Sequence, residues 1–527
     1  MQTQQVFRRC ATALLAGGLI PYSLSIAQEA SVADQTTALT GAHQEKVDGT
    51  DEKHNRIAGL DKVAAAVERL SAQPGTQAGM VGFSLRFLEA PMEGATPGIP
   101  VPLLAVNGGK SLLPASTLKT ITTGCALEIL GKDYQFATVL QHDGTIDPDT
   151  GTLSGNVYVR GSGDPTLAQD GWLGLFEEWR GAIAAAGIKS INGAVVGDDS
   201  AFSSQAVSGG WAWDDIGNYY APPVTGLNFH HNTFFVSFQP GAVGSIARLV
   251  STSPTMPSLE FVNEMRTGPA GSGDQGYVYG APYAETYFLR GSIPKQSGTF
   301  SIKGAIPDPA YFCAVRLDAF LKAKGIIAKG EPTTTRRGYF DAVGTRVDLH
   351  SHLAEPLGDL IRPVNHESLN LDAEALLKAI GSKASGDGST VAGARAVTAF
   401  LKSKGIDTTG FDMVDGCGLS RGNAVTPNQL TAALTLFQNL SGAEKFRASL
   451  PVAGRSGTLK SIGGGTAAEG RIHAKSGTVN RVKCYAGYVD CSSGKKAAFA
   501  IMVHQYTGEY APIKSGITSI MARLAEM

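Results

Sequence analysis

A serine and a lysine three residues apart, Ser116 and Lys119, precede an apolar run that predicts a helix to about Leu130. Residues at i and i+3 of a helix share one face, so the hydroxyl and the amine would meet. A serine hydroxyl needs a base to attack a carbonyl, and a lysine can serve when burial and neighbouring positive charge lower its pKa. The first turn of a helix also offers backbone N–H groups to a developing oxyanion. This spacing is therefore typical of a nucleophilic serine beside its base.

The Ser-x-x-Lys pattern alone is weak, because it recurs at Ser292, Ser492 and Ser493. Pro294 lies inside the first of these repeats and opposes a helix there, whereas the other two lie at a predicted hairpin turn. Only Ser116 is followed by a credible helix. A serine that merely caps the helix is the simpler alternative, and this motif taken by itself favours that alternative.

A second pattern, Ser368-Leu369-Asn370, stands just before another predicted helix. Its hydroxyl could relay a proton, and its amide could contact a substrate. The same Ser-x-Asn pattern occurs at Ser154 and Ser190, so a helix cap or a turn is the alternative interpretation.

The third pattern is Lys475-Ser476-Gly477-Thr478. A strand here would present a cation, a hydroxyl and a bare backbone to a ligand, because Gly477 has no side chain to block a close approach. The triplet recurs at Lys514, but there it opens the last predicted helix. An exposed turn is the alternative for Lys475.

The elements that must position these residues are predicted from the spacing of apolar side chains. Helices are predicted at 60–70, 116–130, 311–321, 371–380, 427–440 and 515–526. Strands are predicted at 81–87, 103–106, 471–474, 482–489 and 497–503. Between 138 and 342 the pattern changes to many short strands separated by glycines, such as 157–159 and 234–238.

Composition narrows the class of protein. The chain has 527 residues, 43% hydrophobic and 17% charged, which excludes a mostly disordered protein. The net charge is −1 and no basic block occurs, so the broad positive field of a non-specific nucleic-acid binder is missing. No apolar run reaches the roughly 18–20 residues that cross a membrane.

The N-terminus predicts export. Arg8 and Arg9 precede a short apolar stretch and a small-x-small site that ends at Ala27. This order is typical of a secretory signal peptide over 1–27, and it predicts a periplasmic or other extracytoplasmic protein. A disordered N-terminus is the alternative. The polar residues 28–55 are predicted to be a linker.

Cysteines and histidines give weaker signals. Removing the predicted signal peptide leaves five cysteines, and Cys484 and Cys491 would lie about 23 Å apart along one strand, too far for a disulfide. No disulfide framework is therefore expected. His350 and His352 share a predicted strand face, but no carboxylate or cysteine cluster has metal-site spacing, so we predict neither a metal nor a cofactor. Trp211 and Trp213, beside Tyr219 and Tyr220, could line a sugar-binding groove, although burial is the commoner role of such aromatics.

The order Ser-x-x-Lys, Ser-x-Asn, Lys-[Ser/Thr]-Gly along one chain adds weight to each motif. With these motifs the sequence resembles the class C low-molecular-mass penicillin-binding proteins, the D-alanyl-D-alanine carboxypeptidase/endopeptidases. The resemblance covers nearly all of the chain after the predicted signal peptide. Further segments similar to the family's are Gly161–Leu167, Gly197–Phe202, Asp415–Arg421, Leu450–Gly454 and Gly457–Leu459.

The resemblance implies an α/β fold. A serine β-lactamase/transpeptidase-like domain, an antiparallel sheet flanked by helices, would be built from 56–137 and 343–527. The long stretch between Ser116 and Ser368 fits the family's insertion, which serine β-lactamases of the same fold lack. Residues 138–342 would accordingly form one or two small β-rich inserted domains.

The resemblance also implies a role for each motif residue. Ser116 would attack the carbonyl of the penultimate D-Ala and form an acyl-enzyme, and Lys119 would take the serine proton. Ser368 would relay a proton towards the leaving group, and Asn370 would contact the substrate amide. Lys475 would supply positive charge near Ser368 and the substrate's terminal carboxylate.

The substrate would lie along the third motif. The backbone N–H groups of Ser116 and Thr478 would form the oxyanion hole, and Ser476, Gly477 and Thr478 would bind substrate. The implied substrates are peptidoglycan muropeptides, and β-lactams would acylate Ser116 as substrate mimics.

Three residues depart from the family pattern: Leu369 stands for the Asp of S-D-N, Ser476 for the Thr of K-T-G, and Cys417 for a Ser in D-G-S-G-L-S. None of them removes a named catalytic group. Two alternatives stay open from the sequence, an esterase or D-aminopeptidase on the same scaffold and a non-catalytic peptidoglycan-binding module.

Overall fold

The structure is a computed structural model that describes residues 59–88, 99–338 and 345–527. These residues belong to one compact unit, Ile57–Met527. The predicted signal peptide and linker lie outside the described residues. The predicted boundaries at 138 and 343 fall inside the unit, and they stay predictions.

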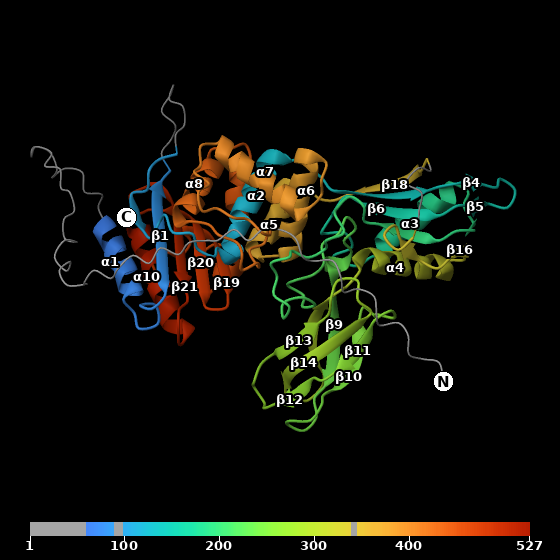
Figure 1. Ribbon diagram of the computed structural model, residues 1–527, viewed down its shortest axis with the longest axis horizontal. Coiled ribbons are helices and arrows are strands. Elements are labelled where there is room, and N and C mark those ends of the chain that lie inside the picture. Colours follow the sequence, from blue (N-terminus) through green and yellow to red (C-terminus); the bar gives the residue numbers. More distant parts are fainter. Residues whose placement is uncertain (1–58, 89–98, 339–344) are drawn as a thin grey trace, which may run out of the picture. The chain divides into compact units, whose positions relative to one another are not determined.

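A five-stranded antiparallel sheet has the order β19-β20-β21-β1-β2. Its strands are β1 (Met80–Phe87), β2 (Leu104–Val106), β19 (Ile472–Val479), β20 (Val482–Asp490) and β21 (Lys496–His504). β1 and β21 come from opposite ends of the chain, yet they pair with each other in the sheet, so the blue β1 lies beside the red β21 in Figure 1.

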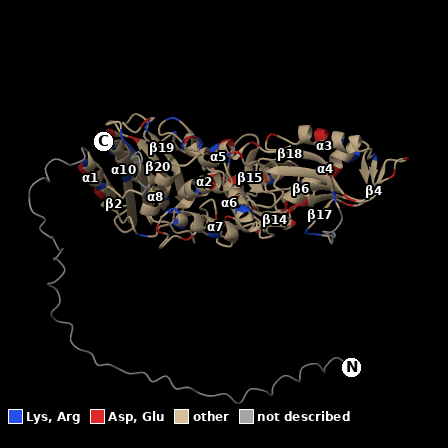
Figure 2. Ribbon diagram, turned by 90° about the horizontal axis from the view of Figure 1, so that it is seen from above, with Lys and Arg blue, Asp and Glu red and all other residues tan. Residues whose placement is uncertain are grey.

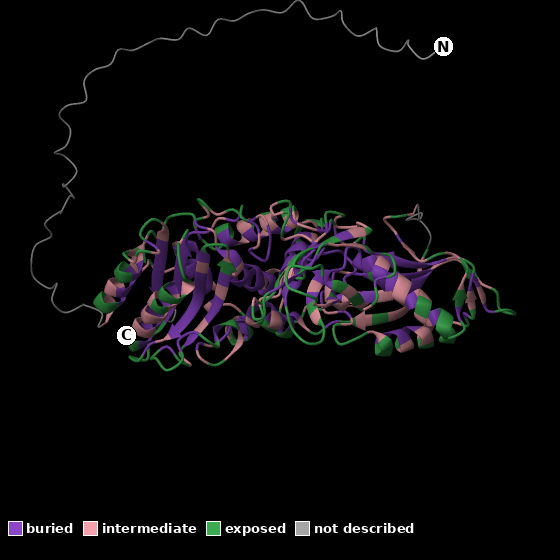
Figure 3. Cartoon of the chain, turned by 90° about the horizontal axis from the view of Figure 1, so that it is seen from below, coloured by how far each residue is buried: buried purple, intermediate pink, exposed green. Residues whose placement is uncertain are grey.

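Both faces of this sheet are covered, which explains why most residues of its central strands are apolar. Successive residues of a strand point to opposite faces. Phe499 and Ile501 pack into the core that includes α1 and α10, whereas Ala500 and Met502 pack into the core that includes α2 and α8. The central strands β20, β21 and β1 are almost wholly buried, and Figure 3 shows long buried strands in this part of the chain. The predicted antiparallel sheet flanked by helices is therefore confirmed.

In the described part of the chain, eight helices surround the sheet, and five of them overlap the helices predicted at 60–70, 116–130, 371–380, 427–440 and 515–526, whereas the other three are not predicted from the sequence. Their bounds are α1 (Leu60–Ser71), α2 (Leu118–Ile129), α5 (Leu357–His366), α6 (Asn370–Ser385), α7 (Thr390–Ser403), α8 (Pro427–Gln438), α9 (Ala443–Ser449) and α10 (Tyr510–Glu526). α8 has a well-defined start, because Thr426 and Gln429 form a capping box and Pro427 occupies the first turn.

The middle of the chain contributes its own sheets and a separate buried core between residues 140 and 326. One five-stranded sheet has the order β17-β8-β6-β3-β18, and one four-stranded sheet has the order β16-β7-β5-β4. Their elements are β3 (Ala137–His142), β4 (Thr145–Ile146), β5 (Thr152–Ser154), β6 (Val157–Gly161), α3 (Leu173–Ala185), β7 (Ser190–Ile191), β8 (Val195–Asp198), α4 (Pro309–Ala323), β16 (Ile327–Ala328), β17 (Thr333–Thr334) and β18 (Val347–Leu353).

Two further sheets of the middle region have the orders β10-β9-β15 and β11-β14-β12, the latter with β13 on β14. Their strands are β9 (Thr233–Gln239), β10 (Arg248–Ser253), β11 (Glu260–Asn263), β12 (Arg266–Gly268), β13 (Gln275–Tyr279), β14 (Thr286–Pro294) and β15 (Phe300–Ala305). β18 lies after the predicted boundary at 343, yet it pairs with β3 and so belongs to a sheet of the middle region.

Three other sequence expectations can be compared with the structure. The sequence predicts at least one unpaired cysteine, and all five described cysteines are buried free thiols. Basic and acidic residues are interspersed along the ribbon in Figure 2. Within the described ranges, no helix combines the length and apolar character that a membrane crossing requires.

Lys378 of α6 ties this helix to the middle region from inside the protein. Its buried amine donates hydrogen bonds to the carbonyl oxygens of Gln205 and Val224, each at 2.8 Å. Burial lowers the pKa of Lys378 to about 8. The amine therefore spans two segments that are distant in sequence, and it does so in a place where its charged form is disfavoured.

We expect Lys378→Met to lower the melting temperature, because two buried carbonyls lose their donor, a loss of about 2–4 kcal/mol. The folded pKa of about 8 lies below the value of about 10.4 in an unfolded chain. The unfolded chain thus binds more protons between about pH 8 and 10, and wild-type stability gains with rising pH across this window. Thermal unfolding at pH 7 and pH 9.5 should show a larger deficit for the variant at pH 9.5. Lys383→Met, on the exposed side of α6, is the control. Equal melting of Lys378→Met and wild type at both pH values would contradict this role.

Candidate active site

The first motif lies at the junction of a short 3-10 turn and a helix. The sequence predicts one helix from residue 116, but Ser116 lies in the turn η1 (Ala115–Thr117) and α2 begins at Leu118. Ala115 has a φ of 46°, in the left-handed region that non-glycine residues rarely adopt. The chain therefore enters the helix through a constrained turn, and Ser116 is presented at the turn instead of inside the helix.

Lys119 is fully buried and links two of the three motifs. Its Nζ lies 3.0 Å from Ser116 Oγ, 2.6 Å from Asn370 Oδ1 and 2.7 Å from the carbonyl oxygen of Cys417. An ammonium group has three hydrogens, so three acceptors satisfy it fully. If the amine loses a proton, its lone pair can accept one, and Ser116 is the only hydroxyl among these partners.

Burial lowers the pKa of Lys119, although four acidic or thiol neighbours act in the opposite direction. Those that raise this pKa are Cys417, Asp415, Glu374 and Asp372. The sequence-based reasoning attributed the lowered pKa partly to the second cation. In the structure, desolvation lowers the pKa of Lys119. The pKa of Lys475 is lowered both by burial and by the positive charge of Lys119.

Lys475 of β19 is also fully buried, and it forms a hydrogen bond with the second motif. Its Nζ donates to Ser368 Oγ at 2.9 Å and to the carbonyl oxygen of Ser476 at 2.7 Å. Ser368 has a φ of 66°, a second strained non-glycine residue beside the site. Strain of this kind, of order 1–3 kcal/mol, persists only where surrounding contacts enforce it. The bond to Lys475 is one such contact.

Asn370 begins α6 and connects the site to the middle region. While its Oδ1 accepts from Lys119, its Nδ2 donates to the carbonyl oxygen of Tyr220 at 2.6 Å. The amide thus holds Lys119 on one side and is itself held on the other. One Nδ2 hydrogen is engaged by Tyr220, and the amide nitrogen has a second one to offer.

The third motif lies on β19. This strand ends at Val479, five residues beyond the predicted end at 474. Gly477 faces the turn that carries Ser116, and β19 packs against η1. A Cβ at residue 477 would lie 2.8 Å from the carbonyl oxygen of Pro114 and 3.0 Å from the backbone nitrogens of Ser116 and Thr117. The glycine is therefore required by the close approach of the Ser116 turn, in addition to any approach of a ligand.

We expect Gly477→Ala to slow acylation at Ser116 by at least about 100-fold, because a misplacement of about 1 Å is enough for such a loss. The clash is with backbone atoms, which cannot rotate away. The rate of labelling by a reactive β-lactam, followed by mass spectrometry, is the measurement. Gly109→Ala is the control, since a Cβ there meets nothing within 4 Å. A Gly477→Ala rate within threefold of wild type would exclude this packing.

The two hydroxyls of the third motif, those of Ser476 and Thr478, form hydrogen bonds near the protein surface. Ser476 Oγ bonds to Thr458 Oγ1 at 2.7 Å, and Lys483 Nζ donates to Thr478 Oγ1 at 3.0 Å. Both hydroxyls lie next to Gly477 on the strand that faces η1. Thr458 and Lys483 were not singled out as site residues from the sequence. Thr458 stood in a family-like segment, whereas nothing marked Lys483.

The loop after α7 holds the carbonyl that accepts from Lys119. Asp415 is buried, and its carboxylate accepts from the indole N–H of Trp211, the backbone N–H groups of Gly418 and Ser420, and the side chain of Asn423. These bonds fix the turn in which Cys417 lies. The family-like segment Asp415–Arg421 thus contributes to the site by placing a backbone carbonyl, that of Cys417, against Lys119.

Glu374, Asp415 and Cys417 lie close enough together to resemble a metal site, with ligand atoms within 4.8 Å of one another. Glu374 Oε1, however, accepts from the backbone N–H groups of Gly416 and Cys417, each at 2.7 Å. Burial, with the nearby Asp415, raises the pKa of Glu374 to about 8. We therefore assign the cluster to fixing the loop.

The aromatic residues near the site divide between core and surface. Trp211 is buried against Asp415, whereas Trp213 is 62% exposed. Tyr220 accepts a hydrogen bond from Asn370 through its carbonyl oxygen. The sequence draws attention to the Tyr220 ring, but a backbone acceptor leaves no side-chain signal, so the role of its carbonyl oxygen is not predictable from the sequence.

Comparisons with known proteins agree with this geometry. The D-Ala-D-Ala carboxypeptidase 3 (S13) family matches residues 100–526. The chain belongs to this family. Among S13 relatives, a D-alanyl-D-alanine carboxypeptidase from Actinomadura sp. (strain R39) is 32% identical over 459 residues, 83% of each chain. The D-alanyl-D-alanine carboxypeptidase DacB of Haemophilus influenzae is 27% identical over 417 residues, 76% of this chain and 82% of that one.

The fold of the S13 family is also seen in solved structures. Penicillin-binding protein 4 (dacB) from Haemophilus influenzae superposes with a TM-score of 0.73 at 24% identity, covering 89% of this chain and 98% of that one. At this identity the likeness concerns the fold alone. The resemblance stated from the motifs, and the transpeptidase-like fold with inserted β-rich domains that it implied, are both confirmed.

Proposed function

We propose that this S13 protein is a serine-type D-alanyl-D-alanine carboxypeptidase, D,D-endopeptidase or both, acting on peptidoglycan stem peptides through an acyl-enzyme on Ser116. The observation that carries the proposal is the 3.0 Å contact between Ser116 Oγ and the amine of Lys119. That amine is fully buried, and burial lowers its pKa. A neutral lysine beside a serine is the activated pair that acyl transfer needs.

In the proposed reaction, Lys119 takes the proton of Ser116 as Oγ attacks the penultimate D-Ala carbonyl. The peptide C–N bond then breaks as the proton held by Lys119 is relayed through the hydroxyl of Ser368, which is hydrogen-bonded to Lys475, to the departing amine, and Lys119 is neutral again. Water then attacks the ester, Lys119 takes its proton, and this proton passes to Ser116 Oγ as the ester C–O bond breaks. The two pairs that begin these transfers, Ser116 with Lys119 and Ser368 with Lys475, lie at 3.0 and 2.9 Å.

Substrate contacts are assigned to groups that lie beside Ser116 and Lys475. We assign the oxyanion hole to the backbone N–H groups of Ser116 and Thr478, and the terminal carboxylate of the substrate to the vicinity of Lys475. Asn370 contributes mainly by holding Lys119, and its second amide hydrogen is assigned to the substrate backbone. Ser476 and its partner Thr458 would border the same groove.

The proposal includes location and inhibitors. Peptidoglycan lies outside the cytoplasmic membrane, so the protein acts in the periplasm or another extracytoplasmic space, with residues 1–27 as its signal peptide. β-Lactams acylate Ser116 as mimics of the substrate. In support, a penicillin-binding protein 4 structure of this fold was solved in complex with a novel β-lactam.

Intact mass after incubation with benzylpenicillin tests the proposal, with the adduct mapped by digestion. We expect one adduct on Ser116 and none in Ser116→Ala. Ser493→Ala is the matched control, because Ser493 also stands in a Ser-x-x-Lys pattern but lies in an exposed turn. Release of D-Ala from a pentapeptide, cleavage of a cross-linked dimer and turnover of simple esters then separate the possible reactions. A folded protein that takes no adduct at high drug concentration would overturn the acyl-enzyme and favour a binding module.

A further inference from the structure

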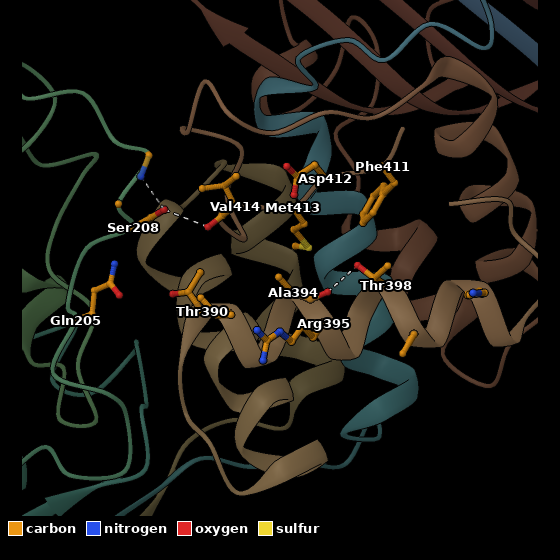
Figure 4. Close-up of a pocket in the computed structure, with 15 residues that line it drawn as sticks. Gln205, Ser208, Thr390, Ala394, Arg395, Thr398, Phe411, Asp412, Met413 and Val414 are labelled. Carbon is orange, nitrogen blue, oxygen red and sulfur yellow. Dashed lines mark hydrogen bonds between the residues drawn. The ribbon is translucent and has the colours of Figure 1, made fainter. Parts of the chain in front are cut away.

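A cavity of about 660 Å³ opens outside the proposed catalytic groups. Figure 4 shows its three walls: one side of α7, the segment Phe411–Val414, and the loop Gln205–Gly210 of the middle region. Its volume lies within the range of about 300–1,000 Å³ that is usual for small-molecule sites. None of the residues that line it belongs to the three motifs.

The lining of the cavity is mainly apolar. Ala394 and Val391 contribute from α7, with Phe411 and Met413 opposite them. Val391 is 54% exposed, an unusual state for a β-branched apolar side chain on a helix that packs against a core. An exposed apolar hollow of this size is typical of a site that a ligand covers.

The charged residues of the lining carry a net positive charge. Arg395 and Lys402 lie on the α7 wall, and Asp412 is the single acidic residue among the lining residues. Neither cation forms an ion pair with an acidic residue in the described part of the chain. An apolar hollow beside two unpaired cations is complementary to a molecule with an apolar body and one anionic group.

Two walls of the cavity continue directly into the site. Val414 precedes Asp415, whose loop holds the Cys417 carbonyl on Lys119. Ser208 Oγ donates to the carbonyl oxygen of Val414 at 3.1 Å, and the same loop leads on to Trp211, which bonds to Asp415. A ligand that moves or stiffens these walls therefore acts on the acceptor of the catalytic lysine.

We propose that this cavity binds an amphipathic ligand with an apolar body and a single anionic group, and that its occupancy changes the rate of acylation at Ser116. The second part rests on the proposed function. The ligand contacts none of the reacting groups, and its effect passes through the Asp415 loop.

Isothermal titration with decanoate tests binding. We expect saturable one-to-one binding, and at least tenfold weaker binding for Ala394→Phe, which fills the hollow. Ser403→Phe, on α7 but outside the lining, is the matched control and should bind as wild type does. Val391→Asp should also weaken decanoate binding tenfold, because it places a negative charge in the lining. Val391 is exposed, so this substitution does not disturb the packing of the core.

The charge of the ligand is tested separately. The double change Arg395→Gln and Lys402→Gln should weaken decanoate binding about tenfold, whereas Lys404→Gln, outside the lining, should not. Decyltrimethylammonium has the same tail with the opposite charge, and wild type should bind it more weakly than decanoate. No saturable decanoate binding, or equal binding by wild type, Ala394→Phe and Val391→Asp, would overturn the site.

The coupling is measured as the rate of benzylpenicillin acylation with and without saturating decanoate. We expect at least a threefold change in wild type and none in Ala394→Phe. An unchanged wild-type rate at saturating decanoate would overturn the coupling. Acylation in the absence of decanoate is measured in the same series, so failure of the proposed function is seen independently.

Discussion

Lys119→Met is expected to lower the rate of benzylpenicillin acylation by at least about 10³-fold, because removal of one member of a nucleophile–base pair abolishes most of its action. Ser116 Oγ loses its only amine partner, which lies at 3.0 Å. Methionine has a similar length and carries no charge, so the buried space stays filled. The measurement is the time course of adduct formation by mass spectrometry.

The same experiment has a pH signature. The base must be neutral to accept a proton, so the wild-type rate should rise with pH through the pKa of Lys119 and then level off. Because burial lowers that pKa, the midpoint should fall below the value of about 10.4 of an ordinary lysine. The exposed Lys132 supplies the control, Lys132→Met, with an unchanged profile. A Lys119→Met rate within tenfold of wild type would show that another group takes the serine proton.

Asp415→Ala is expected to have the largest effect on stability. Its carboxylate accepts from four buried donors, those of Trp211, Gly418, Ser420 and Asn423. Each orphaned donor costs about 1–3 kcal/mol, so we expect a loss of at least about 4 kcal/mol. For a large domain this lowers the melting temperature by roughly 10 °C.

The substitution should also slow acylation of the molecules that remain folded. Without Asp415 the loop no longer fixes the Cys417 carbonyl that lies 2.7 Å from Lys119 Nζ. Melting followed by circular dichroism and acylation rates measured well below the melting temperature separate the two effects. Asp412→Ala, three residues upstream and exposed, should melt within about 2 °C of wild type. An Asp415→Ala protein as stable as this control would show that the four donors find other acceptors.

Much of the catalytic-domain framework could be predicted from local patterns. The apolar spacing of α1 and the alternation in β1 are clear signals of a helix and a strand. Each element buries apolar side chains against the core, and this burial fixes the spacing of those residues. The three motifs were recognisable because each one gathers its polar groups within four residues. The structure joins them through contacts such as Lys119 to Asn370 and Lys475 to Ser368.

The contributions that escaped prediction depend on tertiary contacts. Lys378 looked like any helical lysine, since only the fold brings the carbonyls of Gln205 and Val224 to its amine. The pairing of β18 with β3 was equally hidden, because short strands do not specify a distant partner. Ser116 was placed in a helix because its sequence does not reveal the left-handed residue before it.

The polar groups of the site depend heavily on main-chain oxygens. Lys119, Lys475 and Asn370 each donate to a carbonyl, those of Cys417, Ser476 and Tyr220 respectively. No side-chain substitution deletes a carbonyl oxygen. Two of the three departures from the family pattern, Ser476 and Cys417, lie at these positions, and each of them keeps the carbonyl that a site lysine uses. A substitution there can change the side chain and still leave the acceptor in place, provided that the chain keeps its path.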